Sequence, residues 1–193
     1  MVKYAIPLGL MLLFGNQAWS AGNVTNFQAK GNLAATKPVG CVTLDKLDNT
    51  FTPADLYPAV ASCIRQGDYD NGAQLFAIAG VFGRFDVYRV ADKTSHQGLR
   101  VLLINTFGPL DFEKKQAFQK TLQIQFKKDS KSLRNICNKI DKIGHPGYYP
   151  KYMIMHGMNA ITGNPNKDVM VKDFNAKHAW MSALDTYLHC PVK

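Results

Sequence analysis

Hydrophobic residues between residues 52 and 86 follow the spacing of two amphipathic helices joined by a tight turn. In the first helix they recur three and four positions apart on one face: Leu56, Ala59, Val60, Cys63 and Ile64. Thr52, Pro53 and Asp55 are typical of a helix start, with a hydroxyl N-cap, a proline at the first position and an acid at the third. Gly67 is typical of the residue that follows a helix. A second apolar run begins near Asp70, so the sequence predicts an antiparallel αα-hairpin.

The remaining chain carries the same pattern in further segments. Helices are predicted over residues 92–107, 111–128 and 130–143, over a short segment at 153–161, and over 173–190. The second helix of the hairpin should end near Gly83 or continue with a kink there, although the aromatic and β-branched residues of 81–90 also allow a strand. In 111–128 the stripe Phe118, Leu122 and Phe126 should face the core. Strands are otherwise scarce, and the sequence predicts a single compact all-α domain of about six helices.

The N-terminus has the composition of a secretory signal. It combines a positive end, an uncharged apolar run and small residues at the cleavage point. We expect residues 1–20 to be removed by a cut after Ser20, which leaves a flexible mature N-terminus over 21–40 and a helical domain over 41–193. The expected location is the periplasm or the medium, with no transmembrane segment after removal of the signal.

The chain contains four cysteines. An even number in an exported protein predicts disulfides rather than thiol chemistry, and three connectivities are compatible with four cysteines. We expect the two sequential pairs, Cys41–Cys63 and Cys137–Cys190. The first would tie the loop before the first helix to that helix, and the second would hold the end of the last helix. Each would contribute about 2–4 kcal/mol to stability.

The protein is basic, with 23 Lys and Arg against 14 Asp and Glu. Export argues against nucleic acid as the partner, and leaves anionic lipid, cell-wall polymer or an acidic protein face. The cations gather between residues 114 and 142, where few acids interrupt them. A solvated helix face is one interpretation. The other is a docking surface that speeds association with an acidic-surfaced protein partner, such as a toxin, through Lys127, Lys128, Lys131 and Arg134.

A second candidate surface is the stretch 145–159, which is rich in tyrosine, histidine and methionine. Such residues supply large apolar contact area at low entropy cost and are typical of protein–protein contacts. We therefore select as candidate partner-binding residues Tyr148, Tyr149, Tyr152 and Met155. A structural role within the core is the competing interpretation.

The sequence shows no phosphate-binding loop, no dinucleotide fingerprint and no paired Cys-x-x-Cys, so we expect no cofactor. Ser95 lacks the Gly-x-Ser-x-Gly elbow of a hydrolase, and Asp92 before it is better explained as a helix cap. His145 and His156 match no metal-binding spacing, and their stretch contains no carboxylate to orient either ring. A cell-envelope hydrolase using His145 or His156 is the alternative to a binding protein.

The turn of the hairpin resembles part of a tetratricopeptide or Sel1-like repeat. Gly67–Tyr69 is followed by Gly72, Phe76 and Ala79, and that family has a Gly-x-Tyr turn followed by small, aromatic and small residues at similar spacing. Gly72 stands where alanine is usual. The resemblance covers about one repeat. It implies protein–protein binding, so a repeat-like periplasmic adaptor is a second alternative.

The combination of export, disulfides, basic charge and helices also resembles the periplasmic immunity proteins of type VI toxin–immunity pairs. Those proteins neutralise a toxin delivered to the periplasm. The resemblance is one of overall type and transfers no residues. It implies a stoichiometric inhibitor that occludes the active site of a secreted or periplasmic toxin or enzyme. In this hypothesis the tyrosine-rich stretch is the anchor and the lysine-rich helices steer the partner.

Overall fold

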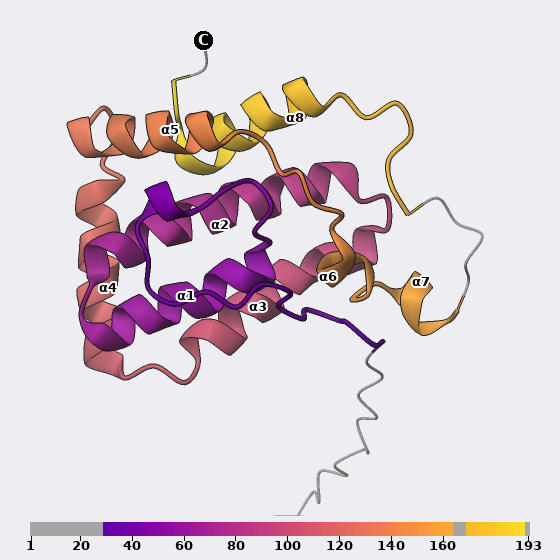
Figure 1. Cartoon of the computed structure of the whole chain (residues 1–193), viewed down its shortest axis with the longest axis horizontal. Coiled ribbons are helices and arrows are strands. Elements are labelled where there is room, and N and C mark those ends of the chain that lie inside the picture. Colours follow the sequence, from indigo (N-terminus) through magenta and orange to yellow (C-terminus); the bar gives the residue numbers. More distant parts are fainter. Residues whose placement is uncertain (1–28, 164–168, 192–193) are drawn as a thin grey trace, which may run out of the picture.

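The structure is a computed structural model that describes residues 29–163 and 169–191. Within them the chain is all-α, as the sequence predicts, with no strand beyond one isolated bridge between Val90 and Met170. The predicted signal peptide and residues 21–28 lie outside the described residues. The helices (Figure 1) are α1 (Pro53–Gln66), α2 (Tyr69–Arg89), α3 (Gly98–Phe107), α4 (Phe112–Gln125), α5 (Lys131–Ile143), α6 (Lys151–Ile154), α7 (Met158–Ile161) and α8 (Ala176–Ala183), with the shorter turns η1 (Leu44–Lys46), η2 (Lys93–Gln97) and η3 (Leu184–Leu188).

The predicted hairpin is formed by α1 and α2, and its ends are held as the sequence indicates. Thr52 caps α1 by accepting a hydrogen bond from the amide of Asp55 at 3.2 Å. The Asp55 carboxylate accepts the Thr52 amide in return at 2.7 Å, which completes a capping box. Gly67 ends the helix at a φ of 79°, a conformation that favours glycine.

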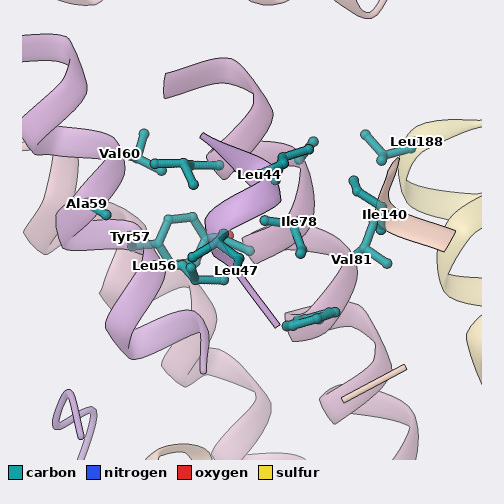
Figure 2. Close-up of a cluster of buried hydrophobic side chains, with 14 of the residues drawn as sticks. Leu44, Leu47, Leu56, Tyr57, Ala59, Val60, Ile78, Val81, Ile140 and Leu188 are labelled. Carbon is teal, nitrogen blue, oxygen red and sulfur yellow. The ribbon is translucent and has the colours of Figure 1, made fainter. Parts of the chain in front are cut away.

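Helix α2 is the centre of the fold, and α1, α4, α5 and α8 pack around it (Figure 1). It runs through Gly83 to Arg89, so the expectation that it ends near Gly83 and the strand alternative for 81–90 are both wrong. The helix continues because residues 81–89 are packed among other helices. The free energy gained by this packing exceeds the loss that their glycine, β-branched and aromatic residues cause through low helix propensity. Figure 2 shows the core at its middle, where Ile78 and Val81 of α2 lie between Leu56 of α1 and Ile140 of α5.

Several predicted helices are shorter or divided in the structure. The segment 92–107 begins as the 3₁₀ turn η2 before α3, and 153–161 splits into α6 and α7. The predicted helix 173–190 begins at Ala176, where the Asn175 side chain accepts the His178 amide at 2.9 Å, and it ends in the π-helical turn η3. In α4, the predicted apolar stripe does face the core, with Phe118 buried.

Both expected disulfides, Cys41–Cys63 and Cys137–Cys190, are present. The first holds the segment before η1 against α1, and the second joins α5 to the end of the chain beyond η3. In the described part of the chain, no helix has the length and apolar composition needed to cross a membrane.

Residues 29–40, which belong to the segment expected to be flexible, contact the helices. The backbone amides of Thr36 and Lys37 donate to Oδ1 of the buried Asp55 at 2.6 and 2.7 Å. The amide of Leu33 donates to the carbonyl oxygen of Tyr152 at 3.0 Å, and its side chain packs against the core. The segment was expected to be flexible because it contains few large apolar residues. Its contacts are made by backbone amides and one leucine, and composition does not reveal such contacts.

Candidate protein-binding surface

The tyrosine-rich stretch is tied to a buried carboxylate on α2. The Tyr152 hydroxyl donates to Oδ2 of Asp86 at 2.6 Å, and the Tyr148 hydroxyl donates to the same oxygen at 2.9 Å. Asp86 is fully buried. Burial raises the pKa of its carboxyl, although Arg89 and the two tyrosine hydroxyls oppose that rise. Burial beside this carboxylate also raises the pKa of both tyrosines well above the usual value.

Arg89 supplies the counter-charge of this buried cluster. Its Nε donates to Oδ1 of Asp86 at 2.8 Å, and its Nη2 lies 2.7 Å from the same oxygen. The guanidinium lies over the rings of Phe85 and Tyr148, at 5.1 and 5.0 Å from the ring centroids. The cluster therefore joins α2 to the 148–152 segment and stabilises the fold from within.

The four candidate residues of this stretch consequently differ in accessibility. Tyr152 is buried, and Tyr148 is half-buried with its hydroxyl on Asp86. Met155 is half-buried in the turn after α6. Tyr149 is 57% exposed, so it is the tyrosine of this stretch that presents a large surface to a partner.

The two histidines of the same stretch contact backbone and amide oxygens. His145 stacks on Phe85 with 5.6 Å between ring centroids, and its Nδ1 lies 3.3 Å from the Pro146 carbonyl oxygen. His156 places Nδ1 at 2.9 Å from Oδ1 of Asn32, and partial burial lowers its pKa. Within the described ranges neither ring contacts a carboxylate, so neither has the orienting partner of a general base.

The residues around Ser95 form a cap, as the sequence analysis favoured. Asp92 accepts the Thr94 amide at 3.0 Å, and the Ser95 hydroxyl donates to the Asp92 carbonyl oxygen at 2.6 Å. His96 directs Nε2 to the carbonyl oxygen of Val90 at 2.9 Å. Ser95 and His96 thus each form a hydrogen bond with a different backbone carbonyl oxygen and not with one another. In the described residues, no three His, Cys, Asp or Glu side chains are grouped so as to hold a metal ion.

The cationic candidate surface lies where α4 turns into α5, and we name its four residues the basic corner: Lys127, Lys128, Lys131 and Arg134. All four are exposed. Arg134 donates from Nη1 to the carbonyl oxygen of Asp129 at 2.5 Å. Lys127, Lys128 and Lys131 contact no carboxylate among the described residues. Asp129, in the turn itself, has a φ of 61°.

The structure separates the basic corner from the tyrosine-rich stretch. The corner lies at the beginning of α5, and the stretch leaves the other end of that helix and leads to α6 (Figure 1). The 13 residues of α5 span about 20 Å at about 1.5 Å per residue. A partner that contacts both surfaces must therefore extend along α5.

Beside the basic corner is an open depression of about 550 Å³ between the start of α5 and the end of the chain. Its walls carry positive groups from Lys128 and Arg134, negative groups from Asp129 and Asp185, and the imidazole of His189. The depression is thus mixed in charge, whereas the exposed corner above it is positive.

One exposed residue beside the corner was not selected from the sequence. Ile124 in the last turn of α4 is 71% exposed. Its signal in the sequence is its position off the stripe of Phe118 and Leu122, because a residue two positions after a buried one points elsewhere on a helix. Next to it, Gln125 donates from Nε2 to Oδ1 of Asp70 at 2.6 Å.

Comparisons with protein families, with curated proteins and with solved structures find no match for this chain.

Proposed function

We propose that this protein is an exported, stoichiometric inhibitor of the immunity type, which binds a secreted or periplasmic toxin or enzyme with an acidic surface. The observation that carries the proposal is the basic corner. Its three lysines stand exposed and contact no carboxylate in the part of the chain that the structure describes. A cluster of uncompensated charge at one corner suits association with an oppositely charged surface.

The basic corner would act mainly on the rate of association. Complementary charges guide partners into contact and can raise association rates from about 10⁵–10⁶ to about 10⁸–10⁹ per molar per second at low salt. Exposed charges are screened over about 8 Å at physiological ionic strength. Association should therefore slow steeply as salt is added.

The alternatives have less support from the described contacts. For a hydrolase, His145 and His156 would need an orienting carboxylate, and each instead contacts a carbonyl or amide oxygen. For a repeat-like adaptor, the α1–α2 hairpin would have to offer a concave surface. Helices α4, α5 and α8 pack on α2 and occupy that position.

The contacts of the tyrosine-rich stretch determine which residues can test binding. Substitution of Tyr148 or Tyr152 removes a donor from Asp86 and disturbs the fold. Tyr149 is exposed, and its side chain is free of such a bond among the described residues, so it is the suitable tyrosine to change.

The test is capture of a partner by the mature, oxidised protein from periplasmic and culture-supernatant extracts, followed by purification of that partner and titration of its activity. Three proteins are compared: the wild type, the variant Lys127→Gln/Lys128→Gln/Lys131→Gln, and the control variant Lys46→Gln/Lys93→Gln/Lys177→Gln, which removes the same charge from exposed positions outside both candidate surfaces.

We expect one dominant partner whose activity is abolished at one inhibitor per molecule. Its association rate should fall at least about tenfold in the corner variant and much less in the control. Failure to capture a protein, or a captured protein whose activity is unchanged, would overturn the proposal. Turnover of cell-wall or lipid substrates that is lost in His145→Ala or His156→Ala would favour the hydrolase.

A further inference from the structure

The exposed isoleucine at the end of α4 has no evident role in folding. Ile124 is 71% exposed and so contributes little to the core. The residues around it on α4 are mostly polar, including Gln116, Gln119 and Gln123. A β-branched residue is also a poorer helix former than glutamine or lysine. Its presence at this position is therefore not explained by the stability of the helix.

The surroundings of Ile124 are cationic. Lys120 lies one helical turn before it on the same face, and Lys127 and Lys128 follow it within four positions. Single exposed apolar residues are ordinary on protein surfaces. Ile124 differs because it lies in the last turn of α4, three and four positions before two lysines of the basic corner that contact no carboxylate among the described residues.

We propose that Ile124 is the apolar anchor of the basic corner, and that the partner's surface is an apolar pocket rimmed by carboxylates. The proposal rests on the proposed function and specifies the chemistry of the partner at that site. In protein interfaces a few side chains that become fully buried carry most of the affinity, the contacts around them exclude water, and complementary charges orient the partner. Ile124 and the flanking lysines have this arrangement.

An acidic protein is a better occupant than an anionic membrane. A helix that lies in a membrane interface needs a broad apolar face opposite its basic one. The exposed part of α4 offers Ile124 among glutamines and lysines. The other exposed apolar residue of the helix, Phe112, lies twelve positions earlier, which places it about 120° away around the helix axis. Two apolar residues on different faces do not form a membrane-binding face.

The chain offers a matched control for this anchor. Ile104 on α3 is also an exposed isoleucine, at 58%, and it lies outside the basic corner. The same substitution at both positions removes the same side-chain atoms. We expect Ile124→Ser to weaken binding to the purified partner about 10- to 100-fold, and Ile104→Ser to change it less than about twofold.

The second measurement reports the chemistry of the partner directly. The photo-crosslinking amino acid p-benzoylphenylalanine replaces Ile124 in one protein and Ile104 in another, and each mature, oxidised protein is irradiated in the extract. We expect a protein adduct from position 124 and little from position 104. Mass spectrometry should place the adduct on a partner segment that contains apolar residues flanked by Asp and Glu.

The outcomes separate this inference from the proposed function. A partner that depends on the corner lysines, yet binds Ile124→Ser and Ile104→Ser equally, overturns the anchor and leaves the inhibitor proposal intact. An adduct on a segment without acidic residues also overturns it. If the protein sediments with vesicles of phosphatidylglycerol and phosphatidylethanolamine, and if this depends on Ile124, the anchor binds a membrane and the proposal of an acidic protein partner is overturned. If no protein is captured or crosslinked, both proposals fail.

Discussion

The Tyr152 hydroxyl donates a 2.6 Å hydrogen bond to Oδ2 of Asp86, 66 positions earlier in the chain. The Tyr148 hydroxyl donates to the same oxygen at 2.9 Å. One buried carboxylate on α2 thus fixes the segment that leads into α6. Tyr148 and Tyr152, which the sequence suggests as partner-binding residues, therefore hold the fold together.

Removal of the Tyr152 hydroxyl should destabilise the protein. We expect Tyr152→Phe to lower the free energy of unfolding by about 1.5–3 kcal/mol, because the lost hydrogen bond is made to a buried carboxylate. Equilibrium urea unfolding measures this change. Tyr149→Phe is the control, since Tyr149 is 57% exposed, and it should stay within about 0.5 kcal/mol of the wild type. Equal stabilities of the two variants would show that the bond to Asp86 contributes nothing.

Removal of one partner of the ion pair between Asp86 and Arg89 should lower the free energy of unfolding more than replacement of both partners by apolar residues. Asp86→Ala leaves the buried guanidinium of Arg89 without its carboxylate, and we expect a loss of about 3–5 kcal/mol. The double variant Asp86→Leu/Arg89→Met removes both charges together and should be more stable than Asp86→Ala. Urea unfolding of Asp86→Leu, of Arg89→Met and of the double variant gives the coupling energy. A double variant that is less stable than both single variants would contradict the expectation.

The stability of the protein should carry a pH-dependent contribution from Asp86. Burial raises the pKa of its carboxyl in the folded state above the usual 3.8, so the folded chain holds this proton more tightly than the unfolded chain. The contribution of Asp86 is therefore most favourable below pH 3.8 and declines as the pH rises through the folded-state pKa.

Urea unfolding of the wild type and of Asp86→Asn across this pH range isolates that contribution. The stability of the wild type relative to the variant should fall as the pH rises above 3.8 and become constant once Asp86 is ionised in the folded state. A relative stability that rises with pH over the same window would mean that the carboxylate form is favoured by folding.

Local features of the fold were predictable because they depend on residues close together in the chain. The capping box of Thr52 and Asp55 and the turn at Gly67 use contacts within a few positions, and both have recognised residue types. The disulfides were predicted from the even number of cysteines, from the expectation of export and from the order of the cysteines in the chain. The end of α2 could not be predicted in this way, because burial by distant helices carries the helix past Gly83 to Arg89.

The candidate site was predictable in part. The four cations of the basic corner are exposed as charged residues usually are. The roles of Tyr148 and Tyr152 depend on Asp86, more than sixty positions away, and no local pattern reveals such a partner. The exposure of Ile124 could have been inferred from the sequence, because Ile124 lies off the predicted core stripe of Phe118 and Leu122.

The two disulfides should differ in their contribution to stability. Cys137–Cys190 closes a loop of 53 positions and Cys41–Cys63 one of 22. The chain-entropy argument gives about 4 kcal/mol for the longer loop and about 3 kcal/mol for the shorter one. We expect Cys137→Ala/Cys190→Ala to be the less stable double variant in urea unfolding. The reverse order would show that contacts around Cys41 and Cys63, rather than loop length, decide the contribution.

Gly80 on α2 should be intolerant of the smallest side chain. A Cβ at this position would overlap the ring of Tyr187 at its Cζ and hydroxyl oxygen. Burial raises the pKa of Tyr187 to about 12. Alanine gains about 1 kcal/mol of helix propensity over glycine, but displacement of the half-buried ring of Tyr187 from its packing on α2 costs more. We therefore expect Gly80→Ala to lower the free energy of unfolding by about 2–3 kcal/mol in urea unfolding.

Two further variants identify the cause of that loss. Gly40→Ala is the control, because no atom lies within 4 Å of a Cβ built at Gly40, and it should change stability by less than about 0.5 kcal/mol. In the background of Tyr187→Leu, which removes the aromatic ring and its hydroxyl, Gly80→Ala should cost much less than in the wild type. An equal cost in both backgrounds would exclude the contact with Tyr187 as the reason for glycine at this position.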